Sequence, residues 1–501
     1  MKSQPEEKTE WPEESTSTLL GLGGELDDGF KDTSHAQAQS VGLLSQKKAR
    51  PPVLRPPPTF RDGKYLGAFI THFVFILIIY MVAGARGPSS AMATHLPGLT
   101  THWRPTLTAL ALATPLGVLG LAHCLVHTPM VRSVLVSQSL YTVVLVQVIF
   151  GVEIVAFCLD ATPIAMVVLG IAALNMRHNN RFADQKKFGV VLMETVRAMV
   201  AEYPQVQVVF ALGAGMYGLF ALVWVQMFLA LVMGAGSLLA ALVWCLLMGL
   251  SLFWTAQTIS RLMGVVITGT LVSYYFNLEA SAEYSAGSGH GSGTWFNSPS
   301  LPWAFLRNGA GYSLGSVCKA SLMAPLAQQA TWDLSKINTK NYILHRAKEI
   351  TAKLAKFSKS YHELSLVHVA LYSKTFRRSA QDVWATVSCS GLQPVLKADF
   401  NRKILQWLAV GPGLGISIFL TTFQLHFRGL SWLLLTFACT LILILGFCIS
   451  VQPLQAAMNC IYMQFAENPG VLSHCETSAM IYARIARITE YHQDSNCEEG
   501  Q

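Results

Sequence analysis

Long apolar runs with few charges recur along the chain, and each approaches the length needed to cross a bilayer. A helix needs about 20 consecutive apolar residues to span the hydrocarbon core. Such runs cover residues 65–85, 107–126, 134–159, 164–176, 206–233, 303–331, 404–425 and 430–451. Because a helix satisfies its own backbone hydrogen bonds in lipid, the pattern predicts an all-α fold, a polytopic helical membrane protein.

The longest apolar run, residues 237–276, is the stretch around which the chain is organised. It contains one charged residue, Arg261, and no proline. It is about twice as long as a bilayer requires, so it forms either two spans joined by a tight turn or one long helix. The lack of proline favours one helix, whereas the placement of basic residues favours two spans. Either alternative gives about ten transmembrane helices, because the second adds a crossing at residues 358–376.

Polar segments flank the predicted ten-span transmembrane domain, residues 61–470. Residues 1–60 are rich in Pro, Ser, Thr, Glu and Gly and are expected to be disordered. Their basic residues directly precede the first span, which places this tail in the cytosol. Residues 471–501 are expected to form a cytosolic C-terminal helix and tail, so both termini lie on one side of the membrane.

Two segments between the spans also have a pattern of their own. Residues 182–203 carry apolar side chains three and four apart, which predicts an amphipathic helix along the cytosolic interface or, equally, one packed on the bundle's own loops. Residues 333–403 contain 13 Lys and Arg against 5 Asp and Glu, so this segment is expected to be cytosolic. Within it, residues 364–372 are apolar but short, which favours a re-entrant or interfacial position.

Composition supports a membrane protein and narrows the function. The chain is 52% hydrophobic and 13% charged, with a mean hydropathy of +0.41, whereas soluble domains carry about 25% charged residues. The net charge of +8 therefore reflects membrane sidedness, and no nucleic-acid partner is expected. The ten cysteines are scattered without a CxxC pair, so no zinc site or other metal is expected. No cofactor is expected, and the lack of a clustered catalytic set argues against an enzyme.

Four segments of the C-terminal half have a distinctive sequence: WTAQTISRLMGVVITGTLVSYYF (254–276), GSVCKASL (315–322), HVALYSKTFRRSAQDVW (368–384) and FAENP (465–469). They resemble motifs of the choline transporter-like family, in its plant and fungal branch. Their order and spacing also agree, over residues 177–491. The resemblance implies a membrane transporter of choline or a related amine or organic cation, working by alternating access or facilitated passage in the plasma membrane or an endomembrane.

The chain departs from the family's pattern at four positions. Arg261 and Gly264 stand where the family usually has Asn and His, Ser373 stands where it has Gly, and Asn468 where it has Asp. The first two departures fall in the central apolar run, so they bear directly on the substrate that the resemblance implies.

Candidate substrate contacts are aromatic, because a quaternary ammonium ion offers no N–H donor and is recognised by ring faces. Trp254 and Gln257 lie one helical turn apart near the middle of the central run, and Trp224 lies in the preceding span. Tyr274, near the end of the run, is a further candidate, although an aromatic belt at the membrane interface explains it as well.

Three charges are expected inside the membrane: Glu153, Arg261 and Lys319. Intramembrane charges are costly and tend to pair or to serve a transport path. Glu153 is the candidate for attracting a cation or exchanging a proton, or else for pairing with Arg261 or Lys319. The alternative function is a non-transporting membrane scaffold or trafficking factor that affects lipid composition, with residues 333–403 binding anionic lipid of the bilayer.

Overall fold

The computed structural model describes residues 60–86, 104–128, 144–156, 162–180, 192–197, 200–201, 204–285, 301–334, 363–390, 392, 396, 401–422 and 430–467. These residues form helices and turns, and no strand occurs among them. The fold class predicted from the apolar runs, a helical membrane protein, is therefore confirmed. Residues 1–59 of the predicted N-terminal tail, the predicted C-terminal tail 471–501 and most of residues 333–362 lie outside the described part.

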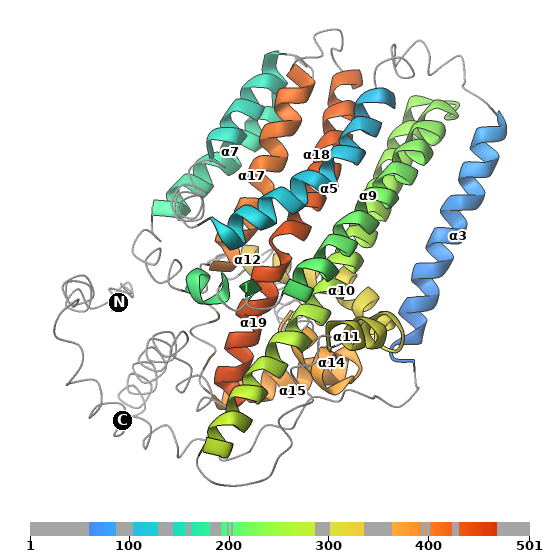
Figure 1. The fold of residues 1–501 in the computed structure, drawn as a ribbon. Coiled ribbons are helices and arrows are strands. Elements are labelled where there is room, and N and C mark those ends of the chain that lie inside the picture. Colours follow the sequence, from blue (N-terminus) through green and yellow to red (C-terminus); the bar gives the residue numbers. More distant parts are fainter. Residues whose placement is uncertain are drawn as a thin grey trace, which may run out of the picture. The chain divides into compact units, whose positions relative to one another are not determined.

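Most apolar runs become helices close to their predicted bounds (Figure 1). They are α3 (Gly63–Arg86), α5 (Arg104–His127), α7 (Thr162–Asn180), α9 (Pro204–Met233), α17 (Asn401–Thr422) and α18 (Leu430–Ser450). Residues 144–156 form a further apolar helix within the predicted third span. Five described helices, α3, α5, α9, α18 and the central helix α10, are long and apolar enough to cross a membrane.

The central run is one continuous helix, α10 (Leu238–Ser285), of 48 residues. At 1.5 Å per residue it is about 72 Å long, which is more than twice the thickness of a hydrocarbon core. It packs against α9, α11, α12 and α18, and also against α14 (Ser365–Tyr372) and α19 (Gln452–Glu467). The alternative of two spans joined by a tight turn is therefore wrong, and the central place of this stretch is confirmed.

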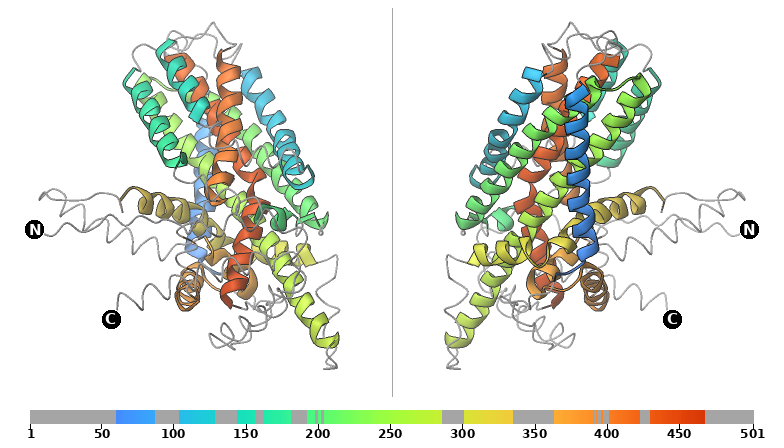
Figure 2. Two further views of the ribbon diagram at one scale, coloured as in Figure 1. Left: turned by 90° about the vertical axis from the view of Figure 1, so that its left-hand side faces the viewer. Right: turned by 90° about the vertical axis from the view of Figure 1, so that its right-hand side faces the viewer.

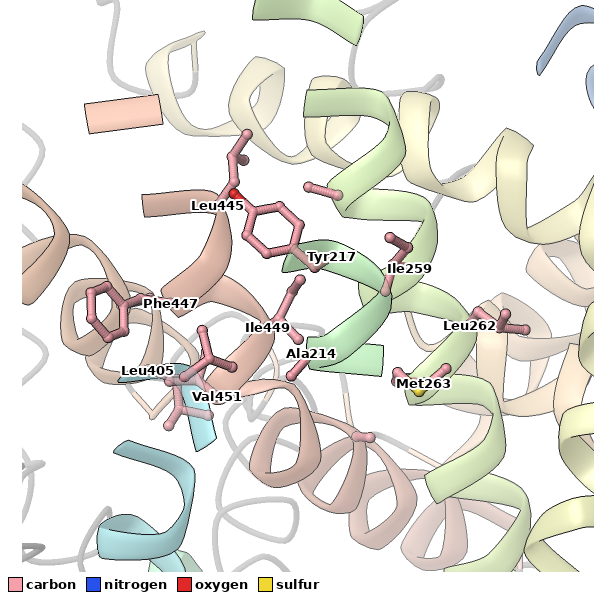
Figure 3. Packing of buried hydrophobic residues seen from close by; sticks show 14 of the residues in the cluster. Ala214, Tyr217, Ile259, Leu262, Met263, Leu405, Leu445, Phe447, Ile449 and Val451 are labelled. Atoms are coloured by element: carbon pink, nitrogen blue, oxygen red, sulfur yellow. The ribbon is translucent and has the colours of Figure 1, made fainter. Parts of the chain in front are cut away.

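Side chains from three helices pack together around the middle of α10 (Figure 3). Ile259, Leu262 and Met263 of α10 lie in one cluster of buried residues with Tyr217 of α9 and Leu445 of α18. The Tyr217 hydroxyl donates a 2.6 Å hydrogen bond to the carbonyl oxygen of Ile442, so the one polar atom of this ring is satisfied. This interlocking holds α9, α10 and α18 together.

The predicted span at residues 303–331 is wrong, because the structure breaks it into two helices. α11 (Leu301–Ala310) ends before Gly311–Ser313, and α12 (Leu314–Leu334) begins after it. The break falls at the end of the polar, glycine-containing segment RNGAGYS (307–313), which lies inside the run predicted as one span, and no proline marks it.

The short apolar segment 364–372 forms the eight-residue helix α14, followed by α15 (Phe376–Cys389). Eight residues are too few to cross a bilayer, so the crossing proposed for residues 358–376 is not formed. Both routes to ten spans therefore fail, and the described residues support a polytopic bundle without confirming that number. In both views of Figure 2, α14 and α15 lie at one end of the bundle, together with α11.

One buried helix was not predicted. α19 begins directly after Val451, at the end of α18, and its residues 452–465 are all buried. Of the predicted amphipathic segment 182–203, residues 192–197 are described as helical, and Leu192, Met193 and Val196 belong to the hydrophobic core.

Candidate functional site

An aromatic cluster surrounds Trp254, the residue predicted to contact substrate. The ring centroids of Phe69 and His72 each lie 5.2 Å from that of Trp254. Phe73 joins the cluster with its centroid 5.1 Å from Phe69, and it lies 5.5 Å from Phe220 of α9. Each such ring pair contributes about 0.5–1.5 kcal/mol beyond its buried area.

The sequence of α3 places three of these rings on one helical face. Phe69, His72 and Phe73 are spaced three and four residues apart, and such positions are neighbours on a helix. They are half-buried, whereas the neighbouring Ile70 and Val74 are 54% and 50% exposed. The helix therefore turns its rings toward α10 and an aliphatic face away from the bundle, toward lipid.

Hydrogen bonds fix the two polar rings of the cluster. The Trp254 indole N–H donates to the carbonyl oxygen of Cys318 on α12, at 3.1 Å. His72 Nε2 lies 2.9 Å from the Ser251 hydroxyl of α10, and its Nδ1 lies 3.3 Å from the Phe69 carbonyl oxygen. The neutral imidazole satisfies both contacts, with Nδ1–H as donor and Nε2 as acceptor. The rings of α3 and α10 are thus held in a defined relative orientation.

This arrangement suits a small organic cation. Indole and phenyl faces carry negative electrostatic potential, and an ammonium group within about 6 Å of a ring centroid is attracted to it. Trp254 and Gln257 are half-buried, whereas Thr255, Ala256 and Thr258 beside them are buried. The two predicted contacts on α10 therefore lie on the side of the helix that is less completely covered by the rest of the protein.

The remaining predicted contacts lie elsewhere. Trp224 of α9 is completely buried, stacks on Phe228 at 4.9 Å and donates its indole N–H to the Met248 carbonyl oxygen at 2.8 Å. In this conformation its ring faces are taken up by packing. Tyr274 lies on the later part of α10, and its side chain is outside the described set.

Both intramembrane cations pair with carboxylates other than Glu153. Arg261 of α10 forms an ion pair with Glu363, just before α14, and both side chains are buried, at 7% and 3% exposed. Lys319 of α12 pairs with Asp62 at 3.2 Å. The expectation that Glu153 pairs with one of these cations is therefore wrong. Glu153 itself is half-buried in the helix 144–156.

The Arg261 pair belongs to a larger polar cluster. Glu363 also accepts a 2.8 Å hydrogen bond from the side-chain amide of Gln455, on α19. One turn away on α19, Gln452 accepts a 2.9 Å hydrogen bond from the Ser260 hydroxyl. These contacts join α10 to α19 and to the α14 end of the bundle, and they neutralise the charge of Arg261.

Gly264 makes room for this cluster. A Cβ atom at Gly264 would lie 2.5 Å from the side-chain nitrogen of Gln452, closer than real contacts allow. The glycine and the arginine that depart from the resembled pattern are therefore complementary parts of one buried arrangement.

A carboxylate–histidine contact lies at the same end. His368 Nε2 of α14 lies 2.6 Å from Glu467 at the end of α19, and the Tyr372 hydroxyl donates to the other oxygen of Glu467 at 3.2 Å. Sequence reasoning missed His72, Asp62, Glu363 and Glu467 as partners. Only His72, a polar residue in the middle of the first apolar run, gave a signal that could have been used.

Comparison of the sequence with models of known protein families identifies the family of this chain. A family model described as "Plasma-membrane choline transporter" matches residues 164–470, more than half of the chain. The protein is a member of this family. The resemblance to choline transporter-like proteins is thereby confirmed, at the level of a family of multi-pass membrane transporters of choline. No curated protein gave a match.

The family match covers α10 and the polar cluster but not the whole candidate site. Trp254, Arg261 and Glu363 lie inside the matched residues, whereas α3, with Phe69 and His72, precedes them. Membership in a choline transporter family makes the aromatic cluster the natural place to look for a cation contact.

Proposed function

We propose that this protein moves choline or a related small amine across the plasma membrane or an endomembrane, with the Trp254 cluster contacting the ammonium group. The observation that carries the proposal is the gathering of Trp254, Phe69, His72 and Phe73 at the α3–α10 contact. Separation of α3 from α10 would take the cluster apart. That opening would provide the alternating access or facilitated passage that transport requires.

The charge arrangement is compatible with a cation substrate. A fixed positive charge beside the pathway would repel choline, but Arg261 and Lys319 are each paired with a carboxylate. We assign Glu153, which is half-buried in the helix 144–156, the role of attracting the cation or of coupling its movement to protons. Gln257 is the polar neighbour for the choline hydroxyl.

The test is uptake of radiolabelled choline by the purified protein in liposomes, with and without a pH gradient. Saturable uptake by the wild type is expected. Trp254→Ala should raise the KM for choline about tenfold or more, since a desolvated cation–π contact contributes about 2 kcal/mol. Trp303→Ala is the matched control, because this indole on α11 is 44% exposed and outside the cluster.

The pH gradient and a Glu153→Gln variant test the coupling role. Gradient-dependent uptake that becomes gradient-independent in Glu153→Gln would support proton coupling, and normal behaviour of a folded variant would remove Glu153 from the mechanism. Failure of well-folded wild type to transport choline or ethanolamine would sink the transporter proposal. The scaffold alternative, with residues 333–403 binding anionic lipid, would then take first place.

A further inference from the structure

The residues directly before α3 dock onto the break between α11 and α12. The Arg61 backbone N–H donates to the carbonyl oxygen of Tyr312, at 3.0 Å. The rings of Phe60 and Tyr312 lie with their centroids 6.1 Å apart. The chain therefore enters α3 while attached to the segment that separates two other helices.

The Asp62 carboxylate makes three contacts there. One oxygen accepts hydrogen bonds from the Ser316 hydroxyl, at 2.7 Å, and from the Phe376 backbone N–H, at 2.9 Å. The other oxygen accepts from the Lys319 ammonium, at 3.2 Å. Asp62 thus joins the start of α3 to α12 and to the start of α15 at the same time.

The contact with α15 is a helix cap supplied by a distant part of the chain. The first backbone N–H groups of a helix have no intrahelical partner, and a carboxylate near them is stabilising. The N-cap residue of α15, Thr375, makes no side-chain capping bond. Asp62 supplies the acceptor instead, although 314 residues separate it from Phe376.

The backbone around Asp62 is shaped for this docking. Asp62 has φ of 51°, in the left-handed region, which costs most L-residues about 1–2 kcal/mol but is tolerated better by Asp and Asn. A Cβ atom at Gly315 would lie 2.3 Å from the Arg61 carbonyl oxygen and 2.7 Å from that of Asp62. Only glycine at position 315 allows the two backbones to approach so closely.

Beyond this docking, α3 has few buried side chains. Ile76 is the one residue of α3 that belongs to the buried core, among those whose side chains the structure describes. Its large outward side chains are exposed and aliphatic or aromatic, such as Phe75, Leu77 and Met81. The docked start of α3 and the packing of the helix on α9 therefore together fix where its rings meet Trp254.

We infer that Asp62 is a positioning residue for the cation site: by anchoring the start of α3 on Lys319, Ser316 and α15, it holds Phe69, His72 and Phe73 against α10. Tyr65, one turn after Asp62, also lies over the Lys319 ammonium, with 5.0 Å from nitrogen to ring centroid. The inference rests on the proposed function, because it assigns Asp62 an effect on choline affinity.

Three variants test the anchor, beside one matched control. Asp62→Asn keeps a residue that tolerates the left-handed backbone and removes the charge, Lys319→Met removes the partner, and Gly315→Ala obstructs the docking. The control is Asp382→Asn, which removes an ion pair with Lys374 whose side chains are each about a third exposed. Each anchor variant should raise the KM for choline by about three- to tenfold with Vmax within about twofold, and the control should not.

A second measurement reads the position of α3 without substrate. Phe69→Cys places a thiol on α3, and the rate at which maleimide labels it is measured. The labelling of the same protein without this substitution is subtracted, so that the native cysteines do not contribute. Asp62→Asn should increase the rate several-fold, because α3 leaves α10 more often, and Asp382→Asn should leave it unchanged.

The outcomes separate the two proposals. If the wild type moves choline but Asp62→Asn changes neither the KM nor the labelling rate, the anchor inference is wrong and the transporter proposal survives. If the wild type does not move choline, the transporter proposal fails. The labelling rate then still decides whether Asp62 fixes α3.

Discussion

At the scale of single residues, three of the four positions that depart from the resembled family pattern have a physical explanation, and the fourth, Asn468, lies outside the described residues. The buried charge of Arg261 is compensated by Glu363. Residue 264 is a glycine because the Gln452 side chain fills the space that a larger side chain there would need. Ser373 stands where the family usually has glycine, and its φ of 48° explains that preference. In this chain a serine accepts the left-handed conformation at the end of α14.

The Arg261–Glu363 pair gives a prediction about stability. Removing one member of a buried pair leaves the other charge without compensation, at a cost of about 3–5 kcal/mol. We expect Arg261→Met and Glu363→Gln each to lower the unfolding temperature of the purified protein in detergent markedly. The double variant should lose less than the sum of the two, since neither charge then remains buried.

The partly buried pair between Lys374 and Asp382 is the comparison for these substitutions. Its side chains are 32% and 35% exposed, so Lys374→Met should cost at most about 1 kcal/mol. Additive effects of the Arg261 and Glu363 substitutions, measured in the same thermal assay, would show that the two residues do not act as a pair.

At the scale of helices, small residues decide how closely α9 approaches its neighbours. The sequence GAGMYG, residues 213–218, has the spacing of a nucleotide-binding motif but lies inside a membrane span, where such residues allow close packing. The structure agrees: a Cβ at Gly213 would lie 2.7 Å from Met263 of α10, and one at Gly218 would lie 2.2 Å from Pro115 of α5.

A glycine series on α9 tests this packing. Gly218→Ala should destabilise the protein by about 1–3 kcal/mol, because the ring of Pro115 cannot move aside easily. Gly213→Ala should cost less, since the Met263 side chain is flexible. Gly215→Ala is the control: nothing lies within 4 Å of its Cβ position, so alanine should be neutral or stabilising by up to about 1 kcal/mol. Equal thermal shifts in all three variants would contradict the packing explanation.

How far the sequence predicts this protein depends on the range of the interaction. Apolar runs predicted α3, α5, α9, α17 and α18 well, because the length of a span is a local property. The ion-pair partners of the charged side chains could not be predicted, because Arg261 and Glu363 are 102 residues apart and Lys319 and Asp62 are 257 residues apart. Trp254 was singled out from the sequence as a substrate contact, which stays a prediction, whereas the rings of α3 that lie beside it were not foreseen.

At the scale of the whole molecule, α10 takes part in two separate groups of interacting side chains, one aromatic and one charged. The aromatic cluster lies around Trp254, about two turns before the buried Arg261 pair. The ion pairs of Arg261, His368 and Lys374 join α10, α14, α15 and α19. Of these helices, α14 and α15 lie at one end of the bundle (Figure 2). A cation bound at Trp254 would therefore be separated from that end of the bundle by side chains whose charges are paired.

The orientation of this end in the membrane gives the last prediction. Residues 333–403, which include α14 and α15, contain 13 Lys and Arg against 5 Asp and Glu, so we expect this end to face the cytosol. Cys389, at the end of α15, is an exposed free thiol and serves as a native probe. In intact cells a membrane-impermeant maleimide should leave Cys389 unmodified, and permeabilisation should expose it.

Comparison with Cys389→Ser isolates this one thiol from the other cysteines. If Cys389 is labelled in permeabilised cells but not in intact cells, the ion-pair network and the anchor at Asp62 lie on the cytosolic side of the Trp254 cluster. Choline entering from outside would then reach the rings before the network, and α3 would have to leave its anchor for release. Labelling in intact cells would reverse this order, so that the anchor would control entry instead of release.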